Sequence, residues 1–131
     1  MKRLTLILAV VCLAIVSCVP VSVNEQVQGD NTLIEYYVKY ASNGGGRTLS
    51  YTDENGKTVT LENIGGDSFE RTVGPVSAGF SASFYVMPKL STTYVNARIE
   101  VKKGDNPFVV KAEYSSSVPG ESATVSYTIK E

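Results

Sequence analysis

Residues 80–86 read FSASFYV, and residues 95–101 read VNARIEV. In both stretches apolar side chains alternate with mostly polar ones. Successive side chains of a β-strand point to opposite faces of a sheet, so a period of two gives each strand one apolar face. Both stretches are therefore predicted to be strands with one face turned toward a core.

The same alternation recurs from residue 31 onward, and no window of helical length keeps an apolar i, i+3, i+4 pattern. Turn-forming sequences such as Asn55-Gly56 and Pro119-Gly120 separate the alternating stretches. We therefore predict an all-β chain of seven or eight short antiparallel strands. Their expected ranges are 32–42, 47–53, 57–63, 67–73, 79–87, 94–102, 107–115 and 122–130.

Strands that each carry one apolar face favour two sheets packed face to face, an Ig-like β-sandwich. A small closed barrel is the alternative. The core cysteines and the tryptophan of true Ig domains are missing from the 31–131 region. "Ig-like" therefore describes the expected architecture alone.

The first 18 residues have a different character. Residues 1–3, which include the basic Lys2 and Arg3, precede an apolar block at 4–16, which is shorter than the roughly 20 residues of a spanning helix. Such a block suits a signal peptide, and Ile15-Val16-Ser17-Cys18 resembles the lipobox of bacterial lipoproteins. The resemblance implies that residues 1–17 are removed and that the Cys18 thiol carries a diacylglyceryl group. Ordinary secretion and an uncleaved anchor are the alternatives.

These features predict three parts: a signal peptide at 1–17, a lipidated N-terminus and flexible tether at 18–30, and a β-sandwich domain at 31–131. The tether is rich in Pro, Ser, Asn, Gln and Gly, and it has no sustained periodicity. An aspartate after Cys18 would resemble an inner-membrane retention signal, but Val19 stands there. The predicted location is the cell envelope, on the outer membrane, with the periplasmic and surface faces both open.

Composition limits the chemistry that the chain can carry out. Without Lys2 and Arg3, the chain has 10 basic and 13 acidic side chains. The resulting net charge of −3 is not concentrated in blocks of like charge. This argues against nucleic-acid binding. No histidine is present to act as a general base or metal ligand. Cys12 leaves with the signal peptide and Cys18 is acylated, so neither disulfides nor zinc sites are expected. We predict no catalysis, cofactor or metal.

Three tyrosines are the candidate ligand-binding residues. Tyr37, Tyr85 and Tyr94 fall on the phase opposite the apolar one and are expected to be exposed. Exposed aromatic rings can stack on sugars or on a partner. Cross-strand packing is the competing interpretation, because tyrosine suits half-buried sheet surfaces without any ligand.

Acidic residues in predicted turns could bind calcium, which requires several converging oxygens. They lack the spacing of a calcium loop, so ordinary turn chemistry is the preferred interpretation. The residues concerned are Asp53, Glu54, Asp67 and Asp105.

Two further features have a structural and a functional interpretation. Arg71 lies on the apparent core phase, and a buried charge needs a partner, so we expect it at an edge or rim. The stretch at 43–46 could hold an anion through its backbone N–H groups. It lacks the lysine and the helix of a P-loop, so a plain loop is expected.

The stretches 49–59 (LSYTDENGKTV), 79–82 (GFSA) and 97–101 (ARIEV) resemble the small extracytoplasmic domain of the mycobacterial MmpS family and similar bacterial lipoproteins. The resemblance implies a transthyretin-like or MmpS-like β-sandwich over about residues 32–130. It also implies an accessory role beside RND-type exporters of lipids and siderophores. This chain departs from the family in its lipidated anchor and in lacking the paired cysteines of those domains.

Together these observations predict a membrane-anchored envelope lipoprotein. It would act without catalysis, as a binding or accessory module with a protein partner in the envelope or transport complex. A surface module that binds a glycan or another ligand through its tyrosines is the alternative. A cluster of acidic residues in a deep cleft would instead indicate a hydrolase.

Overall fold

The computed structural model describes residues 33–44 and 47–131. This part of the chain is all β, and none of it forms a helix of the length and apolarity needed to cross a membrane. Every predicted strand is confirmed, with boundaries shifted by a few residues. The strands are β1 (Tyr36–Asn43), β2 (Arg47–Thr52), β3 (Thr58–Ile64), β4 (Ser68–Val76), β5 (Ser81–Pro88), β6 (Asn96–Lys103), β7 (Val109–Ser115) and β8 (Ala123–Thr128).

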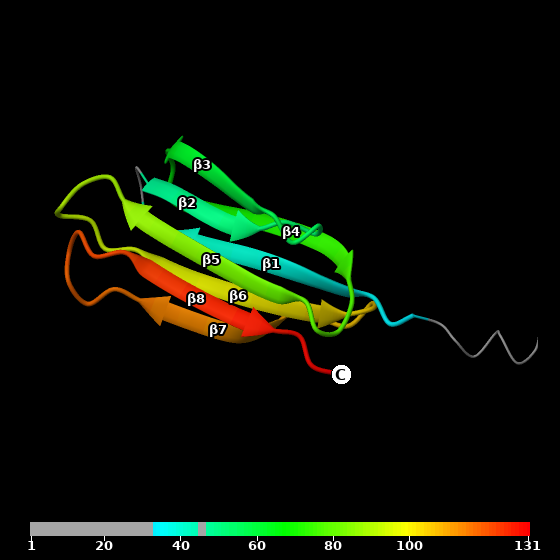
Figure 1. Ribbon diagram of the computed structural model, residues 1–131. Helices are drawn as coiled ribbons and strands as arrows, with labels where there is room; N and C mark the ends of the chain where they lie inside the picture. Colours follow the sequence, from blue (N-terminus) through cyan, green and yellow to red (C-terminus); the bar gives the residue numbers. More distant parts are fainter. Residues whose placement is uncertain (1–32, 45–46) are drawn as a thin grey trace, which may run out of the picture. The chain divides into compact units, whose positions relative to one another are not determined.

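The described strands form two four-stranded antiparallel sheets, in the orders β4-β1-β6-β7 and β3-β2-β5-β8. Figure 1 shows them as two layers. The β-sandwich prediction is confirmed, and the closed barrel is not observed, because each sheet has its own pair of edge strands. The order differs from an Ig constant domain, in which the first two strands share a sheet. Here β1 and β2 belong to opposite sheets.

The core lies between the sheets, where alternate residues of the inner strands meet. Tyr40, Leu49, Phe84 and Ile99 have no exposed surface. The Tyr40 ring lies 5.4 Å from the ring of Phe84, measured between centroids, and its hydroxyl donates a 2.7 Å hydrogen bond to the Thr52 carbonyl. Burial raises the pKa of Tyr40 above its ordinary value. The phenol therefore stays neutral and its polar atom is satisfied, as a buried hydroxyl requires.

One strand departs from the expected alternation. The sequence places Phe108 and Val110 on the apolar phase of β7 together with Ala112. In the structure Ala112 pairs with buried Ile99, but Val110 pairs with the outward-facing Glu100, which makes Lys111 an extra residue. This β-bulge reverses the phase of the first half of β7. The prediction is therefore wrong for Val110 and Phe108.

The sandwich has two distinct ends. The near end, where the described chain enters β1, consists of residues 33–35, 53–57, 77–80, 104–108 and 129–131. The far end consists of Gly44 and of residues 65–67, 89–95 and 116–122. Figure 1 shows the described C-terminus at the near end and the long β5–β6 and β7–β8 connections at the far end.

Candidate functional site

Two loops at the far end are joined by hydrogen bonds although they follow strands of different sheets. The Thr93 carbonyl of the β5–β6 loop accepts a 2.9 Å hydrogen bond from the Gly120 N–H of the β7–β8 loop. At the base of the loops the Ser116 N–H donates to the Val95 carbonyl at 2.9 Å, and the Val95 N–H donates to Ser116 Oγ at 3.0 Å. These contacts make one connected surface from residues 89–95 and 116–122.

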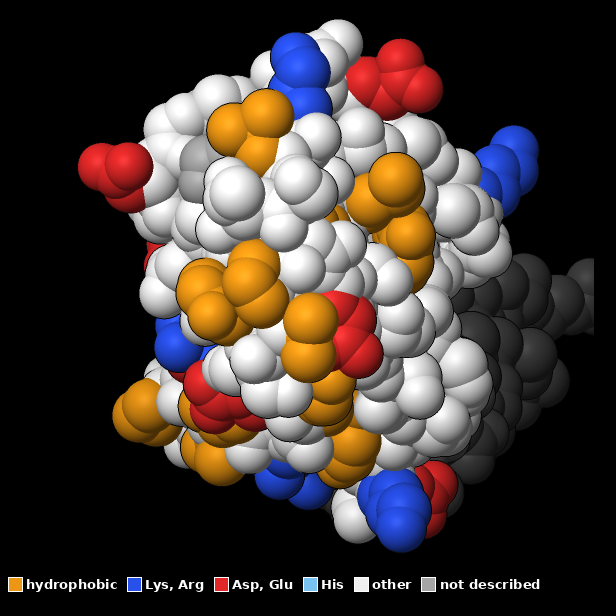
Figure 2. Space-filling model, turned by 90° about the vertical axis from the view of Figure 1, so that its left-hand side faces the viewer, with side chains coloured by type: hydrophobic (Ala, Val, Ile, Leu, Met, Phe, Trp, Pro, Cys, Tyr) orange, Lys and Arg blue, Asp and Glu red, His pale blue; other side chains and the backbone are white. Residues whose placement is uncertain are grey.

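Large apolar side chains are exposed on and beside these loops. Met87 is 50% exposed, Leu90 61%, Tyr94 56% and Val118 56%. Figure 2 looks onto this end and shows hydrophobic side chains spread across it, with acidic side chains among them and lysine and arginine side chains mainly at its margin. Single exposed apolar residues are common on proteins, but their gathering on one face is typical of interaction sites.

Tyr94 lies at a hollow of about 210 Å³, which is otherwise lined mainly by polar side chains. Asn96 Oδ1 accepts a 2.6 Å hydrogen bond from the backbone N–H of Asn43, which joins the end of β1 to the beginning of β6. An exposed aromatic ring beside amides and hydroxyls is a suitable surface for a small polar ligand. The other lining residues are Val95, Ser115 and Ser116.

The structure does not bring the three predicted tyrosines together. Tyr85 is half-buried on the outer face of β5, where it lines a shallow depression with Ser50 and Ser83. Tyr37 is on β1, in the other sheet. Its hydroxyl donates to Glu35 at 3.1 Å, and its ring centroid lies 4.8 Å from Lys102 Nζ. The hydrogen bond to Glu35, together with its charge, raises the pKa of Tyr37. Of the three, Tyr94 alone belongs to the far end.

Arg47 is the largest fully buried side chain of the described residues, although it is not one of the predicted site residues. Its Nη1 donates to the Gly66 carbonyl at 3.1 Å. Its Nε and Nη2 are buried and have no hydrogen-bond partner among residues 33–44 and 47–131. Burial lowers the pKa of Arg47, and the nearby Asp67 opposes the shift. Arg47 shares the inward phase of Leu49 and Tyr51, so the alternation could have identified it.

Replacing Arg47 with methionine is expected to leave the free energy of unfolding unchanged or to raise it. Removing a poorly compensated buried charge while keeping its volume is often neutral or stabilising, by about 1–4 kcal/mol. Arg47→Ala is the comparison, because it also removes the charge but leaves a cavity costing about 2–5 kcal/mol. Urea denaturation of both variants provides the measurement. A methionine variant as unstable as the alanine variant would show that the guanidinium itself stabilises the far end.

The turn interpretation of Asp53 agrees with its contacts. Its Oδ1 accepts the N–H groups of Asn55 at 2.9 Å and Lys57 at 2.8 Å. Asp67 and Asp105 lie in other turns, and no group of three His, Cys, Asp or Glu side chains in the described part of the chain could hold a metal ion. Glu54 is exposed in the same turn as Asp53.

Arg71 is exposed on the edge strand β4, with its guanidinium carbon 5.8 Å from the centroid of the Tyr51 ring. The prediction of an edge or rim position is therefore confirmed, since β4 is an edge strand. Two other sequence predictions, the lipid attachment at Cys18 and the plain loop at 43–46, rest wholly or partly outside the described residues.

Comparison with known proteins does not assign this chain to a family. No protein-family model matches it, and no curated protein has significant similarity to it.

The contact between the two far-end loops gives a direct prediction for Gly120, which has a φ of +82°. A Cβ at this position would lie 2.9 Å from the Ser91 carbonyl oxygen, so Gly120→Ala must push the β5–β6 loop away. Gly56 is the matched control, because its φ is +79° and a Cβ there would meet no atom within 4 Å. Left-handed strain costs both variants about 1–3 kcal/mol, and the larger loss is expected for Gly120→Ala.

Urea denaturation measures the two losses, and amide NMR shifts of residues 89–95 report the loop displacement. Equal destabilisation by the two alanines, with unchanged shifts in the β5–β6 loop, would contradict the close packing of the loops.

Proposed function

We propose that this protein is a lipid-anchored cell-envelope protein that acts as a non-catalytic binding or accessory module, with the far end as its contact surface. The anchor is supported by the basic, apolar and Ile15-Val16-Ser17-Cys18 pattern of the first 18 residues. The binding role is supported by the exposed apolar side chains on the two joined loops at the far end.

The observation that carries the proposal is the placement of this surface relative to the point where the chain enters the sandwich. Strand β1 begins at the near end and has 8 residues. At roughly 3.3 Å per residue it separates the two ends by about 26 Å. A tether joined to the near end therefore holds the domain to a lipid surface while the far end remains available to a partner.

The absence of catalysis is proposed from the residue inventory. The chain has no histidine to pair with its many serines and threonines. A nucleophile of this kind needs an adjacent general base within hydrogen-bond distance. Tyr40 is neutral, buried and used in packing, so it offers no substitute.

Site-specific photo-crosslinking in intact cells tests the proposed surface. A photoreactive residue is placed at Leu90 or Val118 on the far end and, as matched controls, at Thr60 or Ser126, which are exposed on β3 and β8. We expect one discrete crosslinked product from the two far-end positions and none from the controls. Identical product patterns from all four positions, or no product from any of them, would count against the proposed surface.

A glycan or small polar ligand is the second candidate function, favoured by the hollow beside Tyr94. Binding on a glycan array should be lost in Tyr94→Ala and kept in Tyr94→Phe, since the ring supplies the stacking surface. Tyr37→Ala and Tyr85→Ala should bind as the natural protein does. Loss of binding in all the alanine variants would point to a general folding defect instead of a site.

A further inference from the structure

A second hollow lies at the near end, between the edge strands of the two sheets. Strands β7 and β8 lie side by side in Figure 1. A pocket of about 260 Å³ is lined by residues of both strands and of the segments next to them. Its floor is apolar, because Tyr36, Val101 and Ile129 line it and each is at least nine-tenths buried. Tyr127 and Val109 form its walls.

The rim of this pocket is mainly cationic. Three lysines line it, and Glu131 is the one acidic side chain among its lining residues. Lys111 Nζ lies 6.0 Å from the ring centroid of Tyr127, and Lys103 Nζ lies 5.9 Å from that of Tyr36. The ion pairs found in the described residues involve neither of these two lysines. Both ammonium groups are therefore available to an anion.

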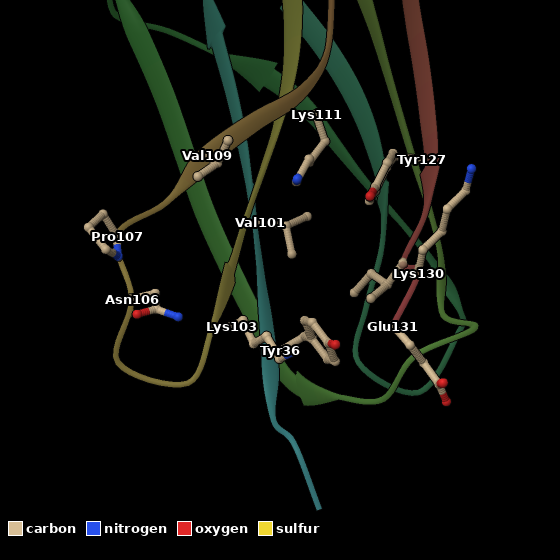
Figure 3. A pocket seen from close by; sticks show the side chains of 11 residues that line it. Tyr36, Val101, Lys103, Asn106, Pro107, Val109, Lys111, Tyr127, Lys130 and Glu131 are labelled. Carbon is tan, nitrogen blue, oxygen red and sulfur yellow. The ribbon is translucent and has the colours of Figure 1, made fainter.

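Figure 3 shows how these side chains lie. Lys111 and Tyr127 extend into the space between the two edge strands, next to Val101. The side chains of Lys130 and Glu131 point away from the pocket at its margin. The charge that faces the pocket is therefore positive, above an apolar floor.

The β-bulge in β7 accounts for the position of Lys111. Ala112 pairs with Ile99 and Val110 with Glu100, so Lys111 is the residue without a partner of its own. A regular alternation would place Lys111 on the outer face, opposite to Ala112. Bulges redirect side chains in this way and are frequent next to functional sites.

We infer that this pocket binds a small anion that carries an apolar body, such as a short-chain carboxylate or a phosphate monoester. The anionic group is held by the ammonium group of Lys111, with Lys103 on the same rim, and the apolar body lies on the floor of Tyr36, Val101 and Ile129. The volume is just below the roughly 300–1,000 Å³ of pockets for drug-sized ligands, which indicates a small ligand. This inference does not depend on the proposed function of the far end.

A charged residue that points inward on an edge strand can also serve only to prevent edge-to-edge pairing. Ligand titration distinguishes the two interpretations. Edge protection needs the charge alone, whereas an amphipathic anion needs both the charge and the buried surface of Val101 and Ile129 beneath it.

The test uses the mature full-length protein in nanodiscs of neutral phosphatidylcholine. Methyl NMR signals of Val101 and Ile129 are followed during titration with hexanoate, with hexanol and inorganic phosphate as probes that lack the charge or the apolar body. We expect saturable shifts with hexanoate and much weaker ones with the other two. Lys111→Gln should weaken hexanoate binding about tenfold, in line with loss of a hydrogen bond to a charged group.

Lys57→Gln is the matched control, because Lys57 is exposed in the β2–β3 turn and does not line the pocket. A second set of nanodiscs contains anionic phosphatidylglycerol. Shifts that appear only in this set, and are lost in Lys111→Gln, identify a lipid headgroup as the ligand. Shifts with hexanoate in neutral nanodiscs identify a free anion, and either outcome supports the site.

Several outcomes would overturn the inference. These are equal shifts with hexanol and hexanoate, equal binding by Lys111→Gln and Lys57→Gln, or no shift with any probe. Unchanged binding combined with faster aggregation of Lys111→Gln would assign the lysine to protection of the sheet edge.

Discussion

Replacing Phe84 with alanine is expected to lower the free energy of unfolding by about 3–5 kcal/mol. Its ring has no exposed surface and lies in β5, an inner strand of its sheet. The ring centroid is 5.4 Å from that of Tyr40 and 6.2 Å from that of Phe69, so truncation opens a cavity between the two sheets. Since domains of this size are stable by only about 5–15 kcal/mol, the loss is a large fraction of the total.

Urea denaturation followed by far-ultraviolet circular dichroism gives the measurement. Ser83→Ala is the matched control, because Ser83 is the neighbouring residue in β5 and is exposed on the opposite face. It should change stability by no more than about 0.5 kcal/mol. If the two substitutions had similar effects, the assignment of inner and outer faces to β5 would be wrong.

Cys18→Ser is expected to release the protein from the membrane fraction. A diacylglyceryl group on Cys18, as proposed, would contribute about 0.8 kcal/mol for each buried methylene, and its two chains together would give a lasting anchor. Cell fractionation measures the distribution, and the intact mass of the purified protein reports the modification and the removal of residues 1–17.

The chain contains its own control for this experiment, since Cys12 is its other cysteine and falls within the predicted signal peptide. Cys12→Ser should still be lipidated at Cys18 and should remain in the membrane fraction. Retention of Cys18→Ser in the membrane with an unchanged mass would show that the N-terminus is processed in some other way, and the proposed location would then lose its basis.

The strands of the described chain could be predicted because alternation is a local property. In β6, for example, Ala97, Ile99 and Val101 follow one another at a period of two, and all are buried. The order of the strands in the sheets could not be predicted in this way, because it depends on contacts between distant segments. The bulge at Lys111 could not be predicted either, because it is defined only by the pairing of β7 with β6.

The candidate site was partly predictable for the same reason. The exposure of Tyr94 follows from its phase in the alternation. Asn43 and Ser116 line the same hollow but come from distant parts of the sequence. A local pattern cannot predict contacts between distant segments. Arg47 was the reverse case. Its phase indicates the interior, yet charged residues are seldom fully buried, so its burial had to come from the structure.

The central position of β1 has a mechanical consequence. If the proposed tether pulls at the beginning of β1 while the proposed partner holds the far end, the force acts along the strand axis. Because β1 is hydrogen-bonded to β4 on one side and to β6 on the other, that force shears two ladders at once. A force applied at the beginning of β1 would then be shared among many backbone hydrogen bonds, whereas an edge strand could be peeled away one hydrogen bond at a time.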